Sequence, residues 1–280
     1  VSLPDSGQYI KGKSTYAGSG GLVTGYVGGA WSITPSFSIG ASGLFHFGRI
    51  TDKIETSIFS QDALTSYVSN SDQLSAIGFT LGVNFRPLQN VSVGASFSTG
   101  GPLRVASEIN YQTAQSGVLA SYDSTLSRSS SSTMPTTFAL GFSYTMDRLL
   151  LVADAELQNM DAMSYRVQTS SAYTNSSRFG FGLIRLGSRS AGASYAERMN
   201  ISAGVGMKSL PYSFYGTQIK EQFATAGVQM PFGGAAMVDA SLVLGLRGDT
   251  DNGRIQEMFG RLCVSISVGE VWFVPFRREL

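Results

Sequence analysis

The sequence predicts an all-β fold, a transmembrane antiparallel β-barrel, on three observations. Apolar and small polar residues alternate with a period of two in a series of short segments, a pattern typical of strands that have one apolar face. Short turns and long polar stretches alternate between these segments, as they do at the two ends of an outer-membrane barrel. Only 14% of the residues are charged, against about 25% in an ordinary soluble domain, so residues for a water-facing surface are scarce.

The alternation is clearest near the end of the chain, where Leu262, Val264, Ile266 and Val268 alternate with small or polar residues and Arg261. We expect the apolar set to face lipid and Arg261 to face inward, because successive side chains of a strand point to opposite faces. The same pattern predicts eleven strands, of which the first is the least regular. In chain order they are residues 15–33, 37–47, 77–85, 91–97, 138–144, 153–157, 179–183, 199–207, 224–230, 236–247 and 261–269.

The connections between the predicted strands fall into two length classes. The short ones carry Pro, Gly or Asp, which suit tight turns: residues 34–36, 86–90, 146–148 and 232–234. The long polar ones are residues 51–72, 104–133, 160–176, 209–220 and 248–254. We assign the short turns to the periplasmic side and the long loops to the outside. The serine-rich stretch 127–133 cannot bury much apolar surface, so we expect a mobile external loop there.

A soluble β-sandwich or a lipocalin-like barrel would also pair an apolar face with a polar one. In those folds the polar face meets water and carries Lys and Glu. Here the polar face is mostly Ser, Thr, Gly and Asn, which suits a crowded or water-filled lumen. We therefore favour the membrane barrel, with the bacterial outer membrane as its location.

Composition excludes several classes of function. The single Cys263 rules out an intrachain disulfide and multi-cysteine metal sites, and the single His46 rules out His-rich metal sites. A net charge of +1 leaves no basic patch for nucleic acid. We expect no catalytic residues, no metal and no cofactor. The sequence contains no run of about 18 apolar residues, which a membrane-spanning helix would need, so a membrane-spanning form must be a barrel.

Charged residues on the inward face of the predicted strands are the candidate ligand-binding residues, because charges facing lipid would be costly. Two interpretations are open for them: a network of ion pairs that fills the lumen, or polar contacts to a ligand. His46 has the same two interpretations, since it projects inward between Phe45 and Phe47. The aromatic residues Trp31, Trp272, Phe273 and Phe276 are expected to form an interfacial girdle. The inward candidates are His46, Asp154, Glu156, Asp239, Arg247, Glu257 and Arg261.

The order of several short motifs resembles the FadL-like family of outer-membrane transporters for long-chain fatty acids and aromatic hydrocarbons. The stretches that carry the resemblance are Gly18-Ser19-Gly20-Gly21, residues 38–50, Arg198, Ala203-Gly204, Gln218-Ile219, Pro231-Phe232-Gly233, Gly245-Leu246-Arg247-Gly248, Ile255-Gln256-Glu257 and Trp272-Phe273. The resemblance implies a fourteen-stranded barrel with an N-terminal hatch and a lateral exit at a kinked third strand. Residues 1–280 would then be a single barrel domain that lacks the hatch and the first three strands. That agrees with a chain that begins at Val1 without a signal region. The family's ligand-binding residues on the hatch and the kinked strand therefore have no counterparts in this sequence.

The predicted function is passive transport of hydrophobic small molecules, such as fatty acids or aromatic hydrocarbons, across the outer membrane. The alternative is a structural or scaffold barrel that binds a partner protein. The expected partners are the lipid bilayer, lipopolysaccharide and a hydrophobic ligand, with no nucleic acid. Because eleven is an odd number of strands, we also expect the first and last strands not to pair with each other, and either further strands of a longer protein or a partner chain to complete the barrel.

Overall fold

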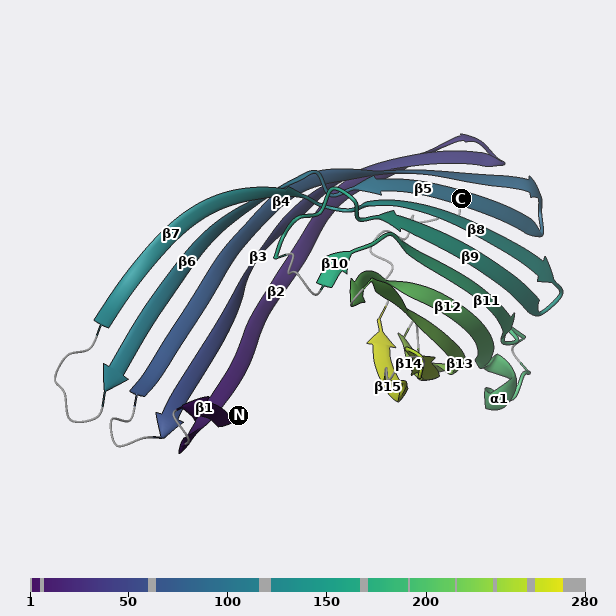
Figure 1. Cartoon of the computed structure of the whole chain (residues 1–280). Helices are drawn as coiled ribbons and strands as arrows, with labels where there is room; N and C mark the ends of the chain where they lie inside the picture. Colours follow the sequence, from purple (N-terminus) through teal and green to yellow (C-terminus); the bar gives the residue numbers. More distant parts are fainter. Residues whose placement is uncertain are drawn as a thin grey trace.

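A computed structural model describes residues 2–5, 8–59, 64–115, 122–166, 171–190, 192–214, 216–233, 236–250 and 255–268. Within these residues the chain forms one antiparallel sheet of fifteen strands and one short helix, α1 (Tyr195–Arg198). Figure 1 shows the sheet bent into a deep trough. The strands are β1 (Ser2–Asp5), β2 (Gln8–Thr34), β3 (Phe37–Phe59), β4 (Leu64–Leu88), β5 (Val91–Thr99), β6 (Pro102–Gln115), β7 (Tyr122–Thr133), β8 (Thr136–Met146), β9 (Leu149–Asn159), β10 (Ser171–Tyr173), β11 (Ser176–Arg185), β12 (Asn200–Phe214), β13 (Thr217–Gly233), β14 (Ala236–Arg247) and β15 (Glu257–Ser267).

Each of the eleven predicted strands is present and lies next to its predicted sequence neighbours. The sheet runs in the order β1-β2-β3-β4-β5-β8-β9-β11-β12-β13-β14-β15. The predicted strands correspond to β2, β3, β4, β5, β8, β9 and β11 to β15, and the all-β prediction is confirmed. The path is open: among the described residues, β2 and β15 are not hydrogen-bonded to each other. This agrees with the expectation that the first and last predicted strands do not pair, and completion of the barrel by further strands or by a partner chain stays a prediction.

Three of the predicted long loops are wrong, because most of their residues are in strands. In one of them, residues 209–220, residues 209–214 belong to β12 and residues 217–220 to β13. Residues 51–59 continue β3, residues 64–72 continue β4, and much of 104–133 is the hairpin of β6 and β7. The hairpin can form because β4 changes its partner: residues 79–88 pair with β5, while residues 64–76 pair with β6. The serines of β7 then complete a backbone ladder with β6. Figure 1 shows β2, β3, β4, β6 and β7 reaching well beyond the other strands.

Glycines permit the change of partner at β4. Gly101 has φ +67, a conformation that favours glycine, and a Cβ there would overlap the backbone oxygen of Ile77. A Cβ at Gly78 would overlap the backbone oxygen of Thr99. Close backbone approach at these two positions lets β6 take the place of β5 beside β4.

The two faces of the sheet differ as the alternation predicts. Leu262, Val264 and Ile266 pair with Leu242, Ala240 and Val238 on one face, whereas Arg261 pairs with Val243 on the other. The apolar face is the more exposed one: Leu242 is 42% exposed and Leu262 72%. The polar face lies inside the curve, where side chains crowd together, and we call it the concave face. Trp31, on the apolar face near the tight-turn end, is 75% exposed, while Trp272, Phe273 and Phe276 lie outside the described residues.

A small hydrophobic core lies on the concave face where β4 meets β6. It consists of Leu74, Ala76, Leu103 and Val105, all at most 6% exposed, with Ile50, Met134 and Tyr165 packed against them. No helix in the described part of the chain is long and apolar enough to cross a membrane.

Candidate functional site

A row of charged side chains crosses the concave face from β9 to β15. Each member is paired with the next across neighbouring strands, so their Cβ atoms are about 5 Å apart. The signs along the row are negative, positive, positive, negative, positive and negative. This charged row consists of Glu156, Arg178, Lys208, Glu221, Arg247 and Glu257.

Arg247 is the best-anchored member of the charged row. Its Nη2 lies 3.2 Å from Glu221 Oε1, and its Nη1 lies 3.4 Å from Glu257 Oε2. Its guanidinium carbon also lies 5.2 Å from the centroid of the Phe259 ring. Glu221 is only 11% exposed, so its ion pair with Arg247 is the better shielded of the two. Arg178 and Lys208 are adjacent cations in the middle of the row.

The charged row lies at the loop end of the shorter strands. Arg247 is the last residue of β14, and Glu257 is the first of β15. A tilted strand crosses a bilayer in about 9–11 residues, and β14 has 12 residues. The charged row therefore lies at one mouth of the trough, opposite the tight turns.

A second row, two residues along each strand from the charged row and nearer the tight turns, is made of glycines and aromatic rings. On the concave face Gly206 pairs with Phe223, which pairs with Gly245, which pairs with Phe259. A Cβ at Gly206 would lie 2.5 Å from a ring atom of Phe223, and a Cβ at Gly245 equally close to the Phe259 ring. Each ring therefore lies over a neighbouring glycine. This glycine–aromatic row gives the concave face a smooth apolar surface beneath the charges.

All seven predicted residues lie on the concave face, but the structure separates them. Glu156, Arg247 and Glu257 share the charged row, and Asp154 is one step deeper, with its carboxylate 2.6 Å from where a Cβ of Gly180 would lie. Asp239 pairs with Ser265 nearer the tight turns, and Arg261 pairs with Val243. His46 is on β3, where its Nδ1 lies 2.9 Å from Thr24 Oγ1, and it is 9% exposed. A ligand-binding role for these residues stays a prediction.

Three members of the charged row were missed. Arg178 and Lys208 each lie one residue beyond a predicted strand, and Glu221 lies three residues before one. The alternation of the neighbouring apolar residues, continued outward, places all three on the inward face. Their lateral alignment depends on strand register, which sequence pattern alone does not give.

A segment between β9 and β10 is fixed against the long strands on the concave face. We call residues 160–166 the latch. Ser164 N donates to Ser132 Oγ at 2.8 Å, Tyr165 Oη donates to Asp72 Oδ2 at 2.8 Å, and Arg166 Nε donates to the same oxygen at 2.7 Å. Arg166 also pairs with Asp52. The latch thus ties the connection after β9 to β3, β4 and β7.

Asp72 is the buried centre of the latch contact, with a side chain that is 3% exposed. Burial alone would raise its pKa, but the nearby Ser107 hydroxyl, the hydrogen bonds from Tyr165 and Arg166 and the positive charge of Arg166 outweigh burial and lower the pKa below its ordinary value. Burial and the hydrogen bond to Asp72 raise the pKa of Tyr165 far above its ordinary range. At neutral pH the latch therefore joins an ionised Asp72 to a neutral Tyr165 and a charged Arg166.

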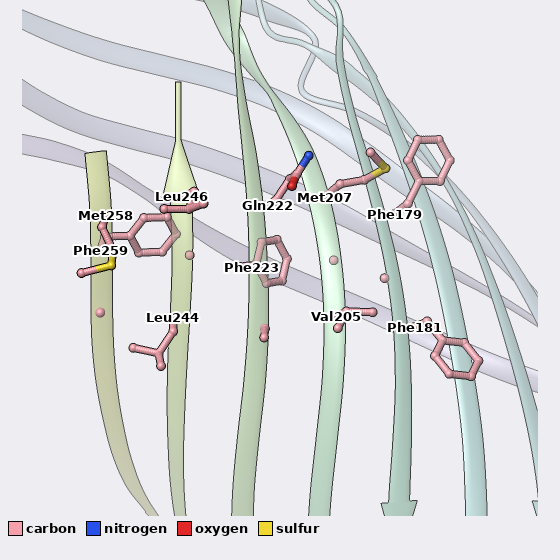
Figure 2. Close-up of a pocket in the computed structure, with 15 residues that line it drawn as sticks. Phe179, Phe181, Val205, Met207, Gln222, Phe223, Leu244, Leu246, Met258 and Phe259 are labelled. Carbon is pink, nitrogen blue, oxygen red and sulfur yellow. The ribbon is translucent and has the colours of Figure 1, made fainter. Parts of the chain in front are cut away.

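The apolar face carries a hollow of about 1090 Å³ over β11 to β15. Figure 2 shows its wall side chains: Phe179, Phe181, Val205 and Met207 lie on one side, and Leu244, Leu246 and Met258 on the other. Ala224 and Gln222 of β13 lie between them. Most of the lining side chains point away from the charged row, but Phe223 and Phe259 of the glycine–aromatic row also border the hollow. Gln222 is a polar side chain in an otherwise apolar surface. Within the described residues no group of three or more His, Cys, Asp or Glu side chains could hold a metal ion.

Comparisons with known proteins agree with this geometry. No curated protein sequence matches the chain. The toluene transporter TbuX of Ralstonia pickettii is similar in structure, with a TM-score of 0.53, 15% identity, and 88% of this chain and 67% of that one covered. A FadL homologue of Pseudomonas aeruginosa has a TM-score of 0.55 and 13% identity, with 92% and 66% covered. The chain thus spans about two thirds of the length of these proteins, and at such identities the likeness concerns the fold.

The fold is therefore that of FadL-like barrels, as the short motifs indicated. A family model described as BamG matches residues 3–278, almost the whole chain. The chain belongs to the BamG family, and it has a FadL-like β-barrel fold.

Proposed function

We propose that this protein resides in the bacterial outer membrane and passively transports hydrophobic small molecules, such as fatty acids or aromatic hydrocarbons. One observation carries the proposal: the glycine–aromatic row lies directly inside the charged row on the concave face. A channel for ions gains nothing from apolar rings in its lumen. A hydrophobic solute that passes the charged mouth would meet the rings of Phe223 and Phe259 and exchange water contact for apolar contact.

Because the sheet is open, a channel built from it needs further strands to close the barrel. In lipid, the outer edges of β2 and β15 would leave a series of backbone groups unpaired, at several kcal/mol per group. We propose that strands from outside the described residues, or from a partner chain, pair with these edges.

Replacing Phe223 with serine tests the transport role. The protein with its native sequence, reconstituted in vesicles that contain lipopolysaccharide, which slows the unaided entry of hydrophobic solutes, should speed the entry of radiolabelled toluene and oleate. F223S should slow this entry about fivefold if the ring contributes about 1 kcal/mol of solute contact. Phe142 is on the apolar face, so F142S is the matched control and should transport normally. Entry no faster than into protein-free vesicles would refute the proposal, and equal loss in both variants would refute the role of the row.

A second candidate, a scaffold that binds a partner protein, is favoured by the long strands. β2, β3 and β4 have 27, 23 and 25 residues, more than twice what is needed to cross a bilayer. Their ends and the β6–β7 hairpin form an ordered sheet outside the membrane-crossing part. Met134 N donates to Gly101 O at 2.9 Å, so the hairpin can be removed by joining these residues. Loss of a stoichiometric protein partner with transport unchanged would support the scaffold role for this region.

A further inference from the structure

A polar cavity of about 510 Å³ lies on the concave face of the long strands, away from the charged row. Its floor is formed by β4, β6 and β7, and the latch forms a wall. The lining includes Asn70, Asp72, Ser107, Arg128, Ser130 and Tyr165. A cavity of this size lies within the range of small-molecule sites, about 300–1,000 Å³.

Strand register places the polar groups of the floor side by side. Asp72 pairs with Ser107, and Ser107 pairs with Arg128. One step away, Val105 pairs with Ser130. The floor therefore combines a carboxylate, two hydroxyls and a guanidinium with apolar surface from Val105.

Several of these groups have hydrogen-bonding capacity to spare. Asp72 Oδ1 and Asn70 Oδ1 are buried and have no hydrogen-bond partner within the described ranges. Ser107 is close enough to lower the pKa of Asp72, but it leaves Oδ1 without a bond of ordinary geometry. Arg128 is exposed at the cavity and can donate up to five hydrogen bonds. The cavity thus offers both donors and acceptors.

The charges around the cavity favour a neutral polar ligand over a simple ion. Arg166 Nη2 lies 2.7 Å from Asp72 Oδ2, so a cation at Asp72 would meet a guanidinium. A simple anion could bind Arg128, but it could not donate to the acceptor oxygens of Asn70 and Asp72. A neutral hydroxyl both donates and accepts, and the C–H faces of a sugar ring would suit Val105 and the ring of Tyr165.

We propose that this cavity binds a saccharide of one or two rings, with its hydroxyls on Asn70, Asp72, Ser107, Arg128 and Ser130. The site is separate from the hydrophobic pathway and needs no transport. It would allow the outer part of the protein to recognise carbohydrate, while hydrophobic solutes pass at the charged row.

The test places a large side chain in the cavity. Ser130 faces the cavity from β7, and Ser129 is the next residue on the same strand, on the opposite face. The full-length protein in detergent is titrated with maltose, lactose, sucrose and chitobiose, and binding is followed by saturation-transfer NMR. At least one sugar should bind saturably to the native protein and to S129Y, but not to S130Y.

A second variant keeps the test informative if S130Y fails to fold. N70A removes one acceptor and should weaken the binding of that sugar about 5- to 10-fold, because one hydrogen bond is worth about 1 kcal/mol. The proposal is overturned if none of the four sugars binds the native protein at its solubility limit. It is also overturned if folded S130Y or N70A binds as tightly as the native protein.

Discussion

Replacing Arg166 with alanine is expected to destabilise the latch region by about 3 kcal/mol. The change leaves the Asp72 carboxylate, 3% exposed, without its cationic partner, and an unpaired buried charge costs about 3–5 kcal/mol. The lower figure applies because the Arg166 side chain is 29% exposed, so water can partly replace it. Urea unfolding of the protein in lipid vesicles, followed by limited proteolysis within residues 160–166, measures the loss.

Asp52 provides the matched control for this change. It pairs with the same guanidinium, but its side chain is 43% exposed, and exposed ion pairs contribute only about 0–1 kcal/mol. D52N should therefore leave the latch nearly as stable as in the native protein. Equal effects of R166A and D52N would mean that the buried carboxylate is not the centre of the latch.

The stability of the latch should also depend on pH in a defined direction. The pKa of Asp72 is lower in the folded protein than its ordinary value, so ionised Asp72 favours the folded state. This contribution is fully present above the ordinary carboxyl pKa and is lost as the pH falls through the lower folded value. In R166A, a large part of this acid dependence should disappear.

The strands could be predicted because the alternation and the turn residues that mark each strand lie within a short stretch of sequence. The alternation in residues 236–247 is complete within one strand, and turns such as Thr34-Pro35-Ser36 carry their own geometry. The hairpin of β6 and β7 was missed although Leu103, Val105, Ile109 and Tyr111 alternate with other residues in its first strand, because the serines of residues 127–133 in its second strand have no apolar set of their own. The hairpin is held through its backbone ladder to β4 and through the latch, both of which are long-range.

In the candidate site, too, the direction of each side chain could be predicted from the sequence, whereas the contacts between distant residues could not. That Glu156 and Arg247 face inward follows from alternation alone. That they belong to one row follows from register across four strand pairs, each free to slip by two residues without exposing an apolar side chain. The contact between Asp72 and Arg166 joins residues 94 apart, and both were placed in loops, where a period-two pattern gives no information.

Arginine at position 242 should destabilise the barrel by about 2–4 kcal/mol, the cost of a lipid-facing Arg near mid-bilayer. Leu242 is in the middle of β14, 42% exposed on the apolar face, opposite Leu262. Ser241, its neighbour, is on the concave face opposite Gly227 and Cys263, where small partners leave room for a long side chain in contact with water. S241R should therefore change the free energy of unfolding by less than about 1 kcal/mol. Urea unfolding of L242R and S241R in phospholipid vesicles compares the effect of an arginine at two neighbouring positions that face opposite sides of the sheet. If S241R were the more damaging, the concave face would be the one in lipid, and the charged row, the latch and the proposed pathway would all be on the wrong side of the sheet.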